Sequence, residues 1–72
     1  MTEEEFLICF QDVLQREEPL QKEMLLQDLP EWDSLAVLST CLFLNENSGK
    51  SLAMPDLADL KTVADVFTLL RG

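Results

Sequence analysis

Three stretches with helical apolar spacing, separated by segments that contain proline or glycine, constrain the fold of this chain most. A capping box formed by Thr2 and Glu5 opens the first stretch. We predict a helix that starts at Thr2 and ends near Arg16 or Glu17, before Pro19. Its buried side chains repeat at helical spacing and are Phe6, Leu7, Phe10, Val13 and Leu14.

The middle stretch begins where an acidic connection turns into an apolar helix. A proline sets a turn there, and Asp33 and Ser34 are both residue types that cap helices well. With Asp33 as the cap, Trp32 and Val37 take the two positions of a hydrophobic staple. We predict a rigid helix from Ser34 to about Asn47, with an exposed hydroxyl at its start.

The same helix has no charged side chain from Ser34 to Asn45, and it is apolar on more than one face. We therefore expect it to be the most buried element of the fold. Gly49 is the expected left-handed stop. The side chains assigned to its core are Leu35, Leu38 and Leu42, together with Trp32.

The last third of the chain predicts a short helix and a final helix. Pro55 favours a short helix at Met54–Leu57, because proline suits the first helical turn. Thr62 then caps a helix with Asp65 at its third position. The inward side chains are Leu57 and Leu60, then Val63, Val66, Phe67 and Leu70.

A long connection runs from Glu18 to Glu31 and is rich in leucine, so we expect its own side chains to hold it down. A short helical turn around Gln21–Gln27 fits its apolar spacing. The whole chain, residues 1–72, is predicted to be one all-α domain, a small bundle of three main helices plus one short helix.

Charge and composition exclude several classes of partner. Fourteen acids against five bases give a net charge of −9, which disfavours nucleic acid because phosphate backbones require clustered cations. The acidity indicates either a basic protein partner or only solubility. We expect a cytoplasmic protein with no membrane span, since the start lacks a secretory signal and no apolar run is long enough. Cys9 and Cys41 lie within apolar helical stretches and are predicted to be reduced thiols in or near the core rather than a disulfide.

The residues do not predict an enzyme. The chain has no histidine, so a serine–histidine pair cannot form, and Ser34 lacks the glycine-rich elbow of a hydrolase. No cysteine and histidine spacing indicates a metal site. Glu31 and Asp33 are a carboxylate pair, but a bundle this small offers no useful pocket. We therefore expect no catalytic residues and no metal ligands.

The run Asp33-Ser34-Leu35, followed by an apolar helix, resembles the attachment motif of acyl carrier proteins and peptidyl carriers. The order of helices resembles that family over nearly the whole chain. The resemblance implies that Ser34 is esterified with 4′-phosphopantetheine, whose thiol carries an acyl or aminoacyl group as a thioester. It implies a phosphopantetheinyl transferase and loading and transferring enzymes as partners, with Asp33 read by the transferase. Asp33 as a plain helix cap remains compatible with that role.

The chain departs from the family along its second helix, where members of bulk fatty-acid synthesis carry several acids. Here Ala36, Ser39 and Asn45 stand at those places, and Glu46 alone is acidic. A late aromatic residue of the family is replaced by Ser48. These departures imply a specialised pathway, with partners reading the shape around Trp32, Ala36 and Val37 more than charge.

Two alternatives stay open at this point. The rival function is an acidic helical protein-interaction module without a prosthetic group. Within the carrier hypothesis, a fatty acyl, polyketide, amino acid or hydroxy acid cargo all fit, and so does a core that shelters an acyl chain. We expect a free-standing monomer, since the chain runs from Met1 to Gly72 as one small domain.

Overall fold

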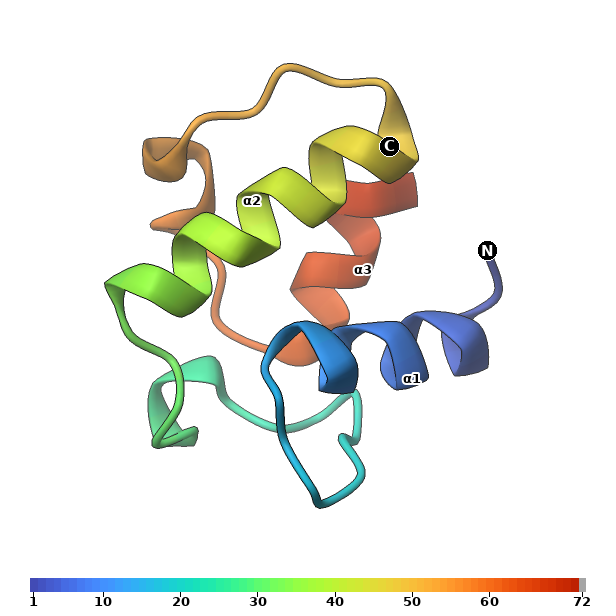
Figure 1. The fold of residues 1–72 in the computed structure, drawn as a ribbon, viewed down its shortest axis with the longest axis vertical. Coiled ribbons are helices and arrows are strands. Elements are labelled where there is room, and N and C mark those ends of the chain that lie inside the picture. Colours follow the sequence, from blue (N-terminus) through green and yellow to red (C-terminus); the bar gives the residue numbers. More distant parts are fainter. Residues whose placement is uncertain (72) are drawn as a thin grey trace.

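A computed structural model of the chain describes residues 1–71 and is helical throughout its regular elements (Figure 1). The elements are helices α1 (Glu3–Val13), α2 (Ser34–Ser48) and α3 (Val63–Arg71), with 3₁₀ turns η1 (Leu26–Asp28) and η2 (Met54–Leu57). Within the described residues there is no strand. In Figure 1, α2 crosses the front of the view, with α3 behind it and α1 below. The predicted all-α fold is confirmed.

Helix α1 begins as predicted and ends earlier than predicted. Glu5 N donates to Thr2 Oγ1 at 3.1 Å, and Thr2 N donates to Glu5 Oε1 at 2.9 Å. The helix ends at Val13, so the expected end near Arg16 or Glu17 is wrong. Gln15 takes a left-handed conformation with φ 54°, which reverses the chain before the proline is reached.

The connection between α1 and α2 is held by its own leucines, as expected, and also by the backbone of the α3 start. Leu20, Leu26 and Leu29 are buried. Leu26 N donates to the Lys61 carbonyl at 2.8 Å, and Val63 N donates to the Met24 carbonyl at 3.0 Å. The expected helical turn lies at Leu26–Asp28, at the end of the range predicted for it. Sequence spacing cannot show the backbone pairing of residues 24–26 with residues 61–63, because the two segments are far apart in the chain.

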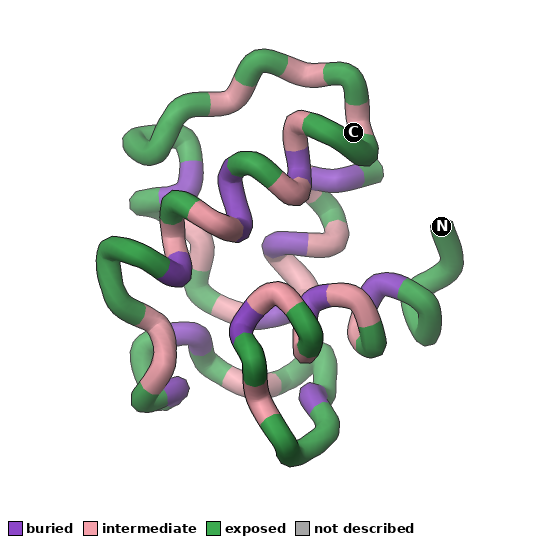
Figure 2. The backbone as a smooth tube through the Cα atoms, in the orientation of Figure 1, coloured by how far each residue is buried: buried purple, intermediate pink, exposed green. Residues whose placement is uncertain are grey.

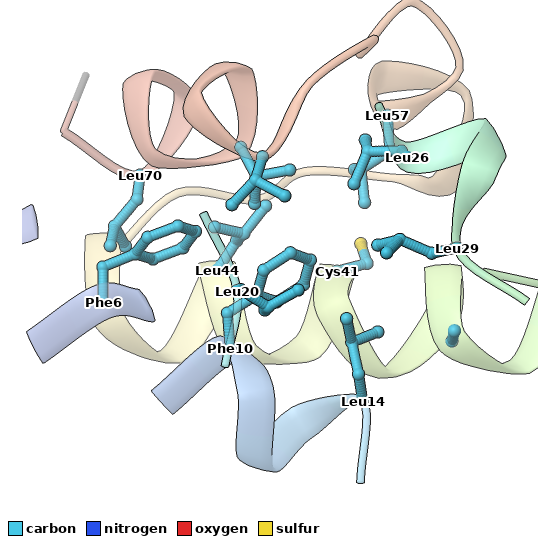
Figure 3. Packing of buried hydrophobic residues seen from close by; sticks show 13 residues of the cluster. Phe6, Phe10, Leu14, Leu20, Leu26, Leu29, Cys41, Leu44, Leu57 and Leu70 are labelled. Carbon is cyan, nitrogen blue, oxygen red and sulfur yellow. The ribbon is translucent and has the colours of Figure 1, made fainter. Parts of the chain in front are cut away.

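The core lies where α2 packs against α1 and α3 (Figure 3). Phe6 stacks on Phe10 with ring centroids 5.4 Å apart, and it meets Phe67 of α3 at 5.1 Å. Cys41 is buried, Cys9 is half-buried, and both are free thiols, as predicted. The buried apolar side chains are Phe6, Phe10, Leu14, Leu20, Leu26, Leu29, Ala36, Cys41, Leu44, Leu57, Val63, Val66 and Leu70.

The burial of α2 differs from the prediction. Leu35, Leu38 and Leu42 are exposed by 70%, 44% and 55%, so their assignment to the core is wrong. The inward residues of the helix are Ala36, Thr40, Cys41 and Leu44. Figure 2 shows buried, half-buried and exposed positions recurring along this helix. Four of its 15 residues are buried, against three of nine in α3, so α2 is not the element with the largest buried share. In a chain this small, α1 and α3 cover only one side of α2.

The second half of the chain follows the prediction. Gly49 ends α2 with φ 73°, the left-handed conformation that glycine adopts without a Cβ penalty. Leu57 is buried in η2 and Leu60 is half-buried. Asp65 N donates to Thr62 Oγ1 at 3.2 Å, and Thr62 N donates to Asp65 Oδ2 at 3.0 Å.

Candidate functional site

The start of α2 is capped by Asp33, as predicted. Asp33 has extended backbone angles, and its Oδ1 accepts a hydrogen bond from Ala36 N at 2.9 Å. Its carbonyl accepts the first intrahelical bond, from Val37 N at 2.9 Å. One carboxylate therefore satisfies the cap, and no other side chain is needed for it.

Ser34 is the first residue of α2 and is exposed. Its hydroxyl has no hydrogen-bond partner among residues 1–71, in contrast to Asp33 beside it. The backbone N–H groups of Ser34 and Leu35 lie in the first turn, where no acidic side chain follows the cap. Unpaired N–H groups and the helix dipole favour an anion at such a place. The hydroxyl is thus free to react, beside groups that would stabilise an attached phosphate.

The segment leading to Ser34 is held in a tight turn. Trp32 N donates to the Leu29 carbonyl and Asp33 N donates to the Glu31 carbonyl, both at 3.0 Å. The Trp32 ring meets Phe10 of α1 edge-on, with centroids 6.2 Å apart and an interplanar angle of 78°. The approach to the candidate site is therefore anchored on α1 by an aromatic contact.

A cleft of about 450 Å³ opens beside Ser34. It is lined by Trp32, Asp33, Ser34 and Val37, and by Met54, Leu57, Ala58 and Leu60. A second hollow of about 830 Å³ shares Trp32, Ala58 and Leu60 with it and continues toward η1 and Lys61. The sequence reasoning missed the contribution of η2 to this site. No local signal marks it, because residues 54–60 reach Ser34 only through the tertiary fold.

The predicted site residues are only partly brought together. Trp32, Asp33 and Ser34 line one cleft, and half-buried Val37 joins them. Ala36 is 9% exposed and belongs to the core, which corrects its expected place on a partner surface. The exposed face of α2 is instead formed by Leu35, Leu38 and Leu42.

Asn45, which stands where the carrier family has an acid, is used inside the molecule. Leu52 N donates to Asn45 Oδ1 at 2.8 Å, and Asn45 Nδ2 donates to the Leu52 carbonyl at 3.0 Å. Cys41 Sγ also donates to that carbonyl, at 3.1 Å. The amide of Asn45 therefore ties the segment after α2 to the helix, an internal role that an acid at this place could not fill in the same way, since it has no N–H to donate.

Among residues 1–71, no group of three or more histidine, cysteine, aspartate or glutamate side chains lies close enough to hold a metal ion. In the same part of the chain, no helix combines the length and apolar content needed to cross a bilayer. Comparisons with protein-family models, with curated proteins and with solved structures find no match for this chain.

Proposed function

We propose that this chain is an acyl carrier protein, in which Ser34 receives 4′-phosphopantetheine from coenzyme A through a phosphopantetheinyl transferase. The observation that carries the proposal is that only one of the two polar side chains at the start of α2 is used for capping. Asp33 caps the helix, and the exposed hydroxyl of Ser34 is left without a partner among the described residues. The hydroxyl of Ser34 is therefore not used to cap the helix and is left exposed at its start.

The residues around Ser34 fit the proposed group. Its phosphodiester would lie beside the first N–H groups of α2, which favour negative charge. The cleft offers an apolar wall from Trp32, Val37 and Leu57, next to the serine. When attached, the arm would supply a terminal thiol that holds an acyl or aminoacyl cargo as a thioester. The protein's own part is to fix the anchor at the rigid end of a helix and to present it to solvent.

Partner enzymes would meet the face of α2 that the structure leaves uncovered. Leu35, Leu38 and Leu42 lie there in helical register and are exposed. They extend the surface expected around Trp32 and Val37, whereas Ala36 is withdrawn from it. An apolar face in place of an acidic one supports a carrier for a specialised pathway, whose enzymes read shape more than charge.

The second candidate is a helical protein-interaction module without a prosthetic group. The same three exposed leucines favour it, because an uncovered apolar helix face is typical of a docking surface. It leaves the unpartnered Ser34 hydroxyl without a role.

A measurement of intact-protein mass distinguishes the carrier function from the interaction module. We would incubate the folded chain with coenzyme A, Mg²⁺ and a broad-specificity phosphopantetheinyl transferase. The wild type and Ser39→Ala, a control serine on the same helix, are expected to gain one phosphopantetheine, and Ser34→Ala none. A folded wild type that gains no mass would leave the interaction module as the better account.

A further inference from the structure

We infer that Arg16 and Glu31 are positioning residues for the site at Ser34. Their ion pair ties the turn after α1 to the segment that leads into α2. The inference rests on the proposed function, because the site it concerns is the proposed attachment serine.

The ion pair is short and largely shielded from solvent. Arg16 Nη1 lies 2.7 Å from Glu31 Oε1, and the two side chains are only 15% and 25% exposed. The other ion pair found among residues 1–71 joins Lys22 and Glu3 at 3.8 Å, with both side chains about half exposed. Exposed pairs are screened and contribute little, whereas partly buried charges depend strongly on their partner. Arg16 Nε is buried with no hydrogen-bond partner in the described chain, so the guanidinium meets Glu31 through Nη1 alone.

Local hydrogen bonds hold the backbone at Arg16, the residue whose side chain contacts Glu31. Gln15 N donates to the Asp12 carbonyl and Arg16 N to the Gln11 carbonyl, both at 3.0 Å, which is the hydrogen-bond pattern of a Schellman motif. The Gln11 amide then donates to the carbonyls of Arg16 and Glu17, at 3.1 and 3.2 Å. A non-glycine residue in the left-handed region, as at Gln15, is retained when surrounding contacts determine the geometry.

Glu31 belongs to the same turn as the cap of α2. Its carbonyl accepts from Asp33 N at 3.0 Å, and Asp33 in turn caps the helix through Ala36 N. A displacement of Glu31 therefore moves the carboxylate that holds the first turn of α2, and Ser34 with it. The side chain of Arg16 reaches this turn from a segment fifteen residues earlier in the chain.

The end of α1 and the start of α2 meet at the edge of the core, where Leu14 and Ala36 are both buried. A hollow of about 230 Å³ opens beside this contact and is lined by Val13, Leu14, Gln15, Glu31, Asp33, Leu35, Ala36 and Ser39. Besides the Trp32–Phe10 contact, the ion pair is a direct link across this region. Loss of the pair is expected to loosen the turn locally and to leave the core intact.

The experiment has two readouts, made on Arg16→Gln, Glu31→Gln and the double variant. The first is hydrogen exchange of the Asp33 and Ala36 amides in the unmodified protein. Each single variant is expected to speed their exchange at least about fivefold, with α3 amides unchanged, because it leaves a partly buried charge without its partner. The second is kcat/KM for phosphopantetheine transfer, expected to fall by about the same factor. Because the two residues act as one unit, the double variant should lose no more than either single one.

Two further variants serve as controls. Lys22→Gln removes a cation from the exposed ion pair and changes net charge by the same amount as Arg16→Gln, so it should leave both readouts unchanged. Arg16→Lys keeps the charge and should restore part of the rate; it also serves if Arg16→Gln does not fold.

Unchanged exchange at Asp33 and Ala36, or losses in kcat/KM that add in the double variant, would overturn the inference. Additive losses would mean that the transferase contacts each residue separately. Failure of the proposed function is distinct, since it appears as a wild-type chain that the transferase does not modify. A modified wild type with variants modified equally fast overturns the positioning role alone.

Discussion

At the scale of single residues, the start of α2 uses one of two adjacent polar side chains to cap the helix. Asp33 makes the capping hydrogen bond, and Ser34 beside it keeps a free, exposed hydroxyl. Of two adjacent residues with similar capping preference, Asp33 alone makes the capping hydrogen bond.

Asp33→Ala is expected to lower the free energy of unfolding by about 1 kcal/mol, since it removes the side-chain acceptor of Ala36 N. Ser34→Ala is expected to change it by less than about 0.5 kcal/mol, because the exposed hydroxyl forms no bond that the substitution would break. Urea denaturation of both variants measures the difference. A Ser34→Ala variant as destabilised as Asp33→Ala would show that the hydroxyl is structural.

Thr40 is a fully buried residue of α2 whose hydroxyl has no hydrogen-bond partner among residues 1–71. Thr40→Val is expected to raise the free energy of unfolding by about 1 kcal/mol, because valine keeps the shape and removes an unsatisfied polar group. Thermal or urea unfolding tests this. Thr68→Val is the control, since that hydroxyl is exposed and donates to the Ala64 carbonyl at 3.1 Å, and it should bring no gain. Loss of stability in Thr40→Val would mean that the hydroxyl has a partner in solution.

At the scale of elements, α2 serves the fold with one face and leaves the other uncovered. Ala36, Cys41 and Leu44 are buried in the core, whereas Leu38 and Leu42 are exposed. An apolar composition on both faces does not by itself tell which one is buried. The neighbours of the helix make that choice, and the uncovered face is then available to a partner.

Leu42→Gln is expected to change the free energy of unfolding by less than about 0.5 kcal/mol, because the side chain is already more than half exposed. Leu44→Ala, two residues along the same helix, is expected to cost roughly 2–5 kcal/mol, since Leu44 is fully buried and its loss leaves a cavity. Chemical denaturation of the two variants measures this contrast. Equal losses would place both faces of α2 in the core.

At the scale of the whole molecule, burial in a small core must outweigh the electrostatic repulsion within a chain of net charge −9. Seventy-two residues bury only about 60% of their unfolded surface, so helix ends and loop contacts matter to stability. Capping boxes secure two helix starts, at Thr2 with Glu5 and at Thr62 with Asp65.

The two capping boxes predict that the folded protein loses stability in acid. The Thr2 backbone N–H, followed by its hydroxyl, lowers the pKa of Glu5 below 4.5, and the backbone N–H groups of Thr62 and Lys61 lower the pKa of Asp65 below 3.8. A carboxyl whose pKa is lower in the folded state stabilises it above the unfolded pKa. The contribution of Glu5 is lost as the pH falls below 4.5 and through its lowered pKa. The contribution of Asp65 is lost in the same way below 3.8.

Thermal unfolding between neutral pH and pH 2 measures this effect. The variant Glu5→Gln, Asp65→Asn should show a shallower loss of melting temperature in acid than the wild type. The two substitutions also lower the magnitude of the net charge from −9 to −7 and so weaken the self-repulsion of the chain. A control variant that neutralises two exposed acids outside the capping boxes, Glu23→Gln with Asp59→Asn, has the same net charge and should keep the steeper loss of the wild type. Equal slopes would mean that the two caps do not carry the pH dependence.

Much of the architecture was predictable because it depends on contacts within a few residues. Thr2, Asp33 and Thr62 cap helices as predicted, and Gly49 ends α2 in the expected conformation. The exposed Ser34 at the head of α2 follows from the same local rules. The carrier resemblance rests on this local pattern, and its function remains a prediction.

The sequence by itself therefore determined where the helices start, which residues cap them and where the free hydroxyl lies. Only the tertiary structure decided that Leu35, Leu38 and Leu42 face outward and that η2 lines the cleft at Ser34. Capping is settled by hydrogen bonds between near neighbours in the chain. Burial and clefts depend on which distant segments meet, and helical spacing carries no information about that choice.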